Sequence, residues 1–120
     1  MSFRDEIQAL VAAIPGATAA VLMGMDGIPI DTFQLPQQSL DVPSVLAALA
    51  ASLQQLNKSS LLVGELGGVE ELVINGKQMT AVLRPLTESY FLAMLLAPGA
   101  ISGKARFLMR LAAPRLIREL

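Results

Sequence analysis

The stretch VEELVINGKQMTAVLRPLTESYFLAMLL, residues 69–96, holds three strand-like segments in succession and decides the fold class. Residues 69–74 lead into Asn75-Gly76, a dipeptide typical of a two-residue type I′ turn, and residues 77–84 return as the partner strand. Tyr90–Leu96 is an almost unbroken apolar run, which indicates a central strand buried on both faces. Consecutive strands joined by tight turns predict an antiparallel sheet.

The N-terminal half carries a second hairpin signal. The apolar run 17–25 ends at Asp26-Gly27, which again suits a type I′ turn, and residues 28–33 return. Because Pro29 has no N–H to donate to a neighbouring strand, we expect this second strand at an edge of the sheet.

Two helices are predicted around this hairpin. Ser2 can cap a helix whose apolar residues recur at helical spacing until Pro15-Gly16 ends it. Asp41 precedes a first turn with proline and predicts a second helix. That helix runs at least to Asn57 or, in the longer alternative, to Val63.

A last helix is expected from Ile101 to the C-terminus, with Pro114 kinking or interrupting it. Its predicted inner stripe is Ile101, Ala105, Leu108, Ala112 and Leu116. The element order is therefore α-β-β-α-β-β-β-α. It predicts one α+β domain over residues 1–120, with a five-stranded antiparallel sheet and helices on both faces.

The composition favours a partner-binding protein. Hydrophobic residues make up 53% of the chain and charged residues only 16%, which is apolar for so small a domain. We expect part of the excess to be covered by a partner, the alternative being a monomer with an apolar core.

The net charge of −1 gives no reason to expect nucleic-acid binding. From Ile101 onward, however, the sequence has five basic residues and only one acidic residue. This excess of positive charge suits an acidic partner, a membrane surface or a solvated helix face.

Few kinds of catalysis are open to this sequence. It has no histidine and no cysteine, which excludes Ser-His and Cys-His nucleophiles and metal sites built from thiolates or imidazoles. Glu70 and Glu71 are adjacent, so on a strand they point to opposite faces and cannot form a paired acid–base site. Residues 99–104 resemble part of a phosphate-binding loop, but Pro98 and Ala105 replace its first glycine and its hydroxyl. We predict no enzymatic activity, no cofactor and no metal.

The N-terminal sequence does not predict a membrane span. Residues 7–25 carry no charge, but Pro15-Gly16 divides them into a helix followed by a strand. No signal peptide is evident, and a cytoplasmic location is expected.

Two surfaces are candidates for binding. The second helix is rich in alanine and has no charge before Lys58, which suits close contact with another helix, although alanine is also simply a good helix former. If the strand at residues 69–74 lies at a free edge, it can pair with its own copy. The predicted dimer strand consists of Glu70, Glu71, Leu72, Val73 and Ile74. The predicted helix surface consists of Ala47, Ala48, Ala51, Gln54, Gln55 and Lys58.

Several motifs in order resemble the Roadblock / dynein light-chain-seven family, which includes bacterial MglB-like proteins. The similarity extends over nearly the whole chain. The motifs that carry it are Ile14-Pro15-Gly16-Ala17, Met25-Asp26-Gly27-Ile28-Pro29-Ile30, Gly64-Glu65-Leu66, Leu83-Arg84-Pro85-Leu86 and Gly103-Lys104-Ala105-Arg106.

The resemblance implies a Roadblock/longin/profilin-like sheet of strand order 2-1-5-4-3, with the second helix on one face and the first and last on the other. It also implies a homodimer through the third strand and second helix, and a Ras-like small GTPase as partner of an MglB-like regulator, with a GTPase-activating or related role, or of a scaffold. Arg84 precedes a proline at a strand end and is not assigned as an arginine finger. The alternatives are a structural scaffold subunit without effect on GTP hydrolysis, and a small-ligand sensor.

Overall fold

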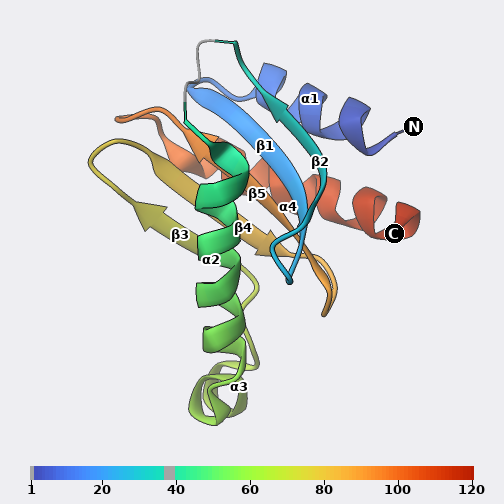
Figure 1. Ribbon diagram of the computed structural model, residues 1–120, viewed down its shortest axis with the longest axis vertical. Helices are drawn as coiled ribbons and strands as arrows, with labels where there is room; N and C mark the ends of the chain where they lie inside the picture. The colour runs from blue at the N-terminus through green and yellow to red at the C-terminus, as the bar shows by residue number, and fades with distance from the viewer. Residues whose placement is uncertain (1, 37–39) are drawn as a thin grey trace.

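Five antiparallel strands form one sheet in the order β2-β1-β5-β4-β3 in the computed structural model, which describes residues 2–36 and 40–120 (Figure 1). The implied strand order is confirmed, with β5 in the centre and β2 at an edge. The strands are β1 Ala17–Gly24, β2 Pro29–Gln34, β3 Leu72–Asn75, β4 Thr80–Pro85 and β5 Tyr90–Leu96.

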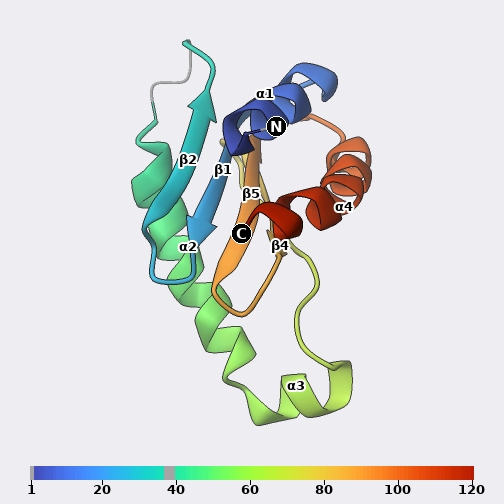
Figure 2. The same ribbon diagram turned by 90° about the vertical axis from the view of Figure 1, so that its right-hand side faces the viewer.

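Helices cover both faces of the sheet. Helix α2 (Val42–Asn57) crosses one face, while α1 (Phe3–Ala13) and α4 (Ser102–Glu119) lie on the other (Figures 1 and 2). A short fourth helix, α3 (Ser60–Leu66), projects beyond the end of the sheet. The apolar run 7–25 divides between α1 and β1, as expected, and no helix in the described part of the chain is long and apolar enough to cross a bilayer.

The sheet separates two hydrophobic cores. Successive residues of β5 point to opposite faces, so Leu92, Met94 and Leu96 pack with α1 and α4. Phe91, Ala93 and Leu95 pack with α2. Burial on both faces explains why β5 reads as a nearly continuous apolar run.

The longer alternative for the second helix is wrong as a single helix. Helix α2 ends at Asn57, and Ser59 then starts α3, its hydroxyl accepting a hydrogen bond of 3.3 Å from the Leu62 N–H. Gly67 ends α3 with a φ of 82°, in the left-handed region.

Neither predicted type I′ turn is present, because that turn needs positive φ at both central residues and, in the described residues, only glycines have positive φ. Gly27 has a φ of 87°, and its N–H donates to the Gly24 carbonyl at 2.9 Å, which closes a turn over residues 24–27. Gly76 has no positive φ, and its N–H donates to the Met79 carbonyl at 2.8 Å across a longer loop. Both connections therefore contain four residues, 25–28 and 76–79.

Helix α4 differs from its prediction at two points. It continues through Pro114, which lies on the exposed side, so of the two predicted outcomes, a kink or an interruption, the interruption is wrong. Ile101 precedes the helix and is exposed, so it is not part of the inner stripe. The residues of α4 that are buried are Ala105, Met109, Ala112, Ala113 and Leu116.

Candidate interaction surface

The free edge of the sheet is formed by β3, which pairs with β4 alone. The Gly76 N–H bonds to Met79 at the end of this hairpin, and bonded and non-bonded residue pairs alternate along an antiparallel ladder. Leu72 and Ile74 therefore direct their backbone groups to β4. Val73 and Asn75 direct theirs outward, where a further strand could accept and donate hydrogen bonds.

The side chains of β3 divide between the two cores. Leu72 packs against the core beneath α2, and Val73 packs against the core beneath α1 and α4. Ile74 lies on the same face as Leu72 and has 38% of its surface exposed. The edge thus offers an apolar side chain on the α2 side.

Glu70 and Glu71 do not belong to this edge, so the prediction that placed them in the strand is wrong. The strand begins at Leu72, because the preceding glycine-containing segment bends before it reaches β4. Glu71 is instead paired with Arg106 of α4, and Glu70 is exposed in the bend.

The outer face of α2 consists of small and uncharged side chains. Ala48, Ala51 and Gln55 are exposed, whereas Gln54 is half-buried. Ala47 is half-buried and lies beside the β1–β2 connection, where a Cβ on Gly27 would come within 3.3 Å of the Ala47 Cβ. Most of the predicted helix surface is therefore accessible on one side of the protein.

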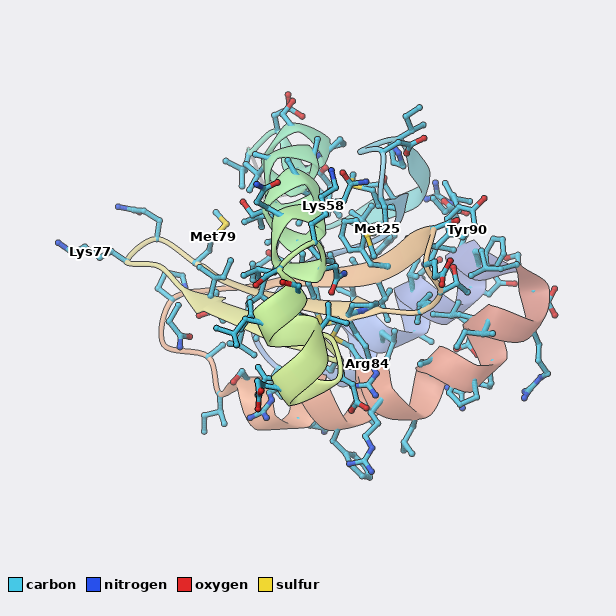
Figure 3. The ribbon with its side chains drawn as sticks, turned by 90° about the horizontal axis from the view of Figure 1, so that it is seen from below. Met25, Lys58, Lys77, Met79, Arg84 and Tyr90 are labelled. Atoms are coloured by element: carbon cyan, nitrogen blue, oxygen red, sulfur yellow. The ribbon has the colours of Figure 1, made fainter. Side chains whose placement is uncertain are left out.

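Lys58 caps the C-terminal end of α2 and is exposed. Figure 3 views the protein from this end, with α2 on one side of the sheet and α4 on the other. Lys77 and Met79 lie on the β3–β4 loop at the far edge. The α2 face and the β3 edge are therefore neighbours, joined by the core that includes Leu46 and Leu72.

Sequence reasoning missed α3. Its outer side chains include Leu61 and Leu66, both exposed, and none of its residues is buried. The available signal was Ser59 as a capping residue followed eight positions later by Gly67, a combination that frames a separate short helix.

This surface has few side chains that could bind a metal ion or stabilise a developing charge. Within residues 2–36 and 40–120, no group of three or more acidic side chains could hold a metal ion. Arg84 is half-buried at the end of β4, and neither α2 nor β3 contains an arginine. The arrangement suits contact with another polypeptide.

Comparison with known proteins matches residues 4–96 to the Roadblock/LC7 domain. MglC from Myxococcus xanthus is 33% identical and aligns over 100% of both chains, with a TM-score of 0.71. An MglB with tetrameric arrangement aligns over 96% of this chain and 85% of its own, with 19% identity and a TM-score of 0.83. The gliding protein mglB from Thermus thermophilus aligns over the same shares, with 18% identity and a TM-score of 0.82. A search of curated protein sequences gives no match.

Proposed function

The chain belongs to the Roadblock/LC7 domain family, and we propose that it is a homodimeric, non-enzymatic regulator or scaffold that binds a Ras-like small GTPase. The observation that carries this proposal is the juxtaposition of an unpaired strand edge, β3, with the uncharged outer face of α2. Roadblock domains are generally regulators and scaffolds without catalysis, in keeping with a chain that lacks histidine and cysteine.

The dimer proposal rests on backbone chemistry. The outward-facing groups of Val73 and Asn75 can pair with the same groups of a second copy about a twofold axis. Each such hydrogen bond contributes roughly 0.5–1.5 kcal/mol net. Burial of Ile74 and of the exposed alanines adds an apolar contribution.

The same pairing fixes the shape of the dimer. Antiparallel strands related by a twofold axis keep corresponding sheet faces on the same side. The two copies of α2 then lie side by side on one face of a continuous sheet, and α1 and α4 of both copies lie on the opposite face. The two α2 helices form a composite surface that a monomer lacks, and we assign the GTPase to it.

The GTPase itself is proposed from similarity. The gliding protein mglB from Thermus thermophilus has a similar structure, and the family resemblance implies a Ras-like GTPase as the partner of MglB-like members. The uncharged α2 surface fits a protein partner better than a small charged ligand, because it offers few convergent polar groups.

A binding experiment tests the proposal. The chain is mixed with the Ras-like GTPase encoded nearest to its gene, loaded with GDP or with a non-hydrolysable GTP analogue, and affinity is measured by calorimetry. We expect a complex that prefers one nucleotide state and that Ala51→Glu weakens at least tenfold. The matched control is Ala12→Glu, an exposed helical alanine on α1, which should leave the affinity unchanged. Absence of binding in both nucleotide states would refute the GTPase assignment.

One observation favours a scaffold over a direct activator. Neither α2 nor β3 supplies an arginine that could stabilise the transition state of GTP hydrolysis. A stable complex with no change in hydrolysis rate would support the structural role, whereas stimulated hydrolysis would support the regulatory role.

A further inference from the structure

The helices on the sheet face opposite α2 carry more positive charge than the rest of the chain. Helices α1 and α4 contain six of the nine basic residues and only three of the ten acidic residues. Both helices lie on one face of the sheet and run antiparallel, so that the two chain termini are at the same end (Figures 1 and 2). This layer is therefore basic although the chain as a whole has a net charge of −1.

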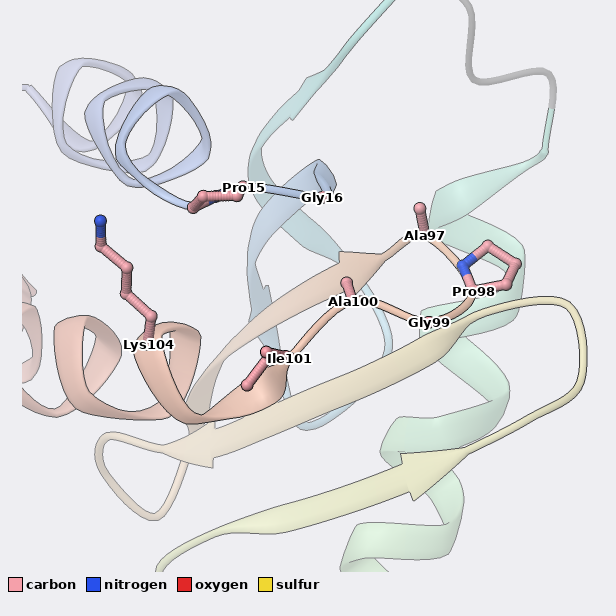
Figure 4. A pocket seen from close by; sticks show the side chains of 8 residues that line it. All are labelled: Pro15, Gly16, Ala97, Pro98, Gly99, Ala100, Ile101 and Lys104. Atoms are coloured by element: carbon pink, nitrogen blue, oxygen red, sulfur yellow. The ribbon is translucent and has the colours of Figure 1, made fainter.

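A series of hollows follows the seam between α1 and α4. The first, of about 520 Å³, lies where Gly16 and Pro15 approach the start of α4, and Lys104 borders it (Figure 4). The second, of about 210 Å³, is lined by small and aliphatic side chains that include Ala9, Ala13, Leu108 and Leu111. The third, of about 160 Å³, lies between Phe3 and Arg118 at the far end. The second and third hollows share Glu6 and Arg115, whereas the first is separate and lies at the other end of the seam; we call the three hollows together the α1–α4 groove.

Charged side chains of both signs border this groove. Lys104, Arg115 and Arg118 are basic, and Glu6 and Glu119 are acidic, which leaves the lining with a small excess of positive charge. Arg115 is paired with Glu6 of α1, whereas no salt bridge of the described residues includes Lys104 or Arg118. These two cations stand at opposite ends of the groove.

Two large apolar side chains are exposed among the charged residues of α4. Phe107 is 57% exposed and Leu111, one turn later, is 48% exposed, although the opposite side of the helix is already buried in the core. Exposed apolar side chains beside a basic groove mark an interaction surface.

We propose that the α1–α4 groove binds an acidic amphipathic helix of a partner protein. Apolar residues of that helix would lie over Ala9, Ala13 and Leu111, and its carboxylates would face Lys104 and Arg118. Because α4 has 18 residues and a helix rises 1.5 Å per residue, the groove accommodates a helix of roughly five turns. A hollowed seam fits a helix, whereas a membrane surface would contact only protruding side chains.

This site goes beyond the proposed GTPase function. The groove lies within one subunit and on the sheet face opposite α2, so that its occupation requires neither dimerisation through β3 nor a GTPase. In the proposed dimer, both grooves lie on the same side and could bind two helices of one partner assembly.

A peptide selection tests the proposal with the intact chain. A display library of random 18-residue peptides is selected on the wild-type protein and counter-selected on the double variant Lys104→Glu/Leu111→Glu. We expect enriched peptides with a net negative charge and apolar residues at helical spacing. The leading peptide should bind each single variant at least tenfold more weakly and should shift the NMR signals of α1 and α4.

Matched variants guard against a general effect of charge or folding. Lys77→Glu on the β3–β4 loop makes the same charge change, and Leu61→Glu on α3 makes the same apolar-to-acidic change; both should bind the peptide as the wild type does. Failure to enrich peptides that distinguish the double variant, or enrichment of neutral or basic ones, would overturn the proposal. Wild-type binding to vesicles of equal parts phosphatidylcholine and phosphatidylserine, lost in Lys104→Glu, would assign the face to a membrane instead.

Discussion

The two edges of the sheet differ in how they are protected against pairing with another strand. At the β2 edge, Pro29 has no N–H to offer, and the β1–β2 ladder shifts register between Leu22 and Met23. The Thr32 N–H donates to the Asp31 carboxylate at 3.0 Å, so a backbone group that would face outward is already bonded. Prolines, irregular pairing and charged residues are the usual means by which proteins block a sheet edge.

The β3 edge has none of these protections. Leu72–Asn75 contains no proline and no charged residue, and it pairs with β4 in unbroken register from Leu72/Leu83 to Asn75/Thr80. The contrast indicates that the β2 edge is protected against pairing with another strand, whereas the β3 edge is open to it. The proposed dimer is therefore built on β3. The following predictions test that contrast, beginning with the largest expected effect.

The largest effect is expected from Ile74→Pro. Ile74 directs its backbone groups to β4, so that proline removes a hydrogen bond within the sheet and leaves a carbonyl without its partner. We expect a loss of unfolding free energy on the order of 3 kcal/mol. Val73→Pro, one residue away, should cost only about 1 kcal/mol, because its N–H faces outward. Urea unfolding at low protein concentration measures both losses of unfolding free energy. Equal losses would refute the assignment of the Ile74 backbone to β4 and of the Val73 backbone to the free edge.

The second prediction concerns the dimer. Val73→Pro removes one outward donor from each copy, and the two lost hydrogen bonds should weaken dimerisation by roughly 2–3 kcal/mol, or about a hundredfold. Thr32→Pro at the β2 edge is the matched control and should leave the dimer intact. Analytical ultracentrifugation over a range of concentrations gives the dissociation constants. If both variants remain dimeric, the interface lies elsewhere.

A smaller effect is expected from placing a lysine at each edge. Ile74 and Ile30 have similar exposed fractions, 38% and 41%, and lie on β3 and β2 respectively. Ile74→Lys brings like charges together across the twofold axis and should weaken the dimer about tenfold. Ile30→Lys should have no effect on the dimer. The same effect from both would remove the distinction between the edges.

The smallest effect is expected from Asp31→Ala. Asp31 pairs with Arg4 at 3.0 Å, and an ion pair this accessible contributes little to stability. Unfolding free energy should fall by less than about 1 kcal/mol, while the freed Thr32 N–H opens the β2 edge to association. Light scattering should then detect species larger than the wild type at high concentration. An unchanged mass would show that Pro29 and the register shift protect the edge without Asp31.

The strands of the sheet were predicted from the sequence more accurately than the loops and the ends of the elements. Buried strands such as β5 carry their own signal, because only apolar residues suit burial on both faces. Pro29 likewise marked an edge strand through its missing N–H. The strand order came from the family resemblance, since hairpin signals alone fix only adjacent pairs.

Loop and terminus details depended on tertiary contacts that no local pattern encodes. Glu71 lies just before the strand, after a bend at Glu70, and pairs with Arg106, a partner 35 positions away. Asp26-Gly27 matches a type I′ dipeptide, yet the chain closes a turn one position earlier, with Gly27 alone at positive φ. The α1–α4 groove could not be predicted either, because it exists only where two helices from opposite ends of the chain meet.

Amide hydrogen exchange at the β3 edge tests the central claim most directly. NMR exchange rates of the Val73 and Asn75 amides are compared at high and at low protein concentration. We predict slow exchange for both amides at high concentration, which becomes fast on dilution as the β3 edges separate. Fast exchange of both amides at every concentration would contradict pairing through β3 and, with it, the proposed dimer.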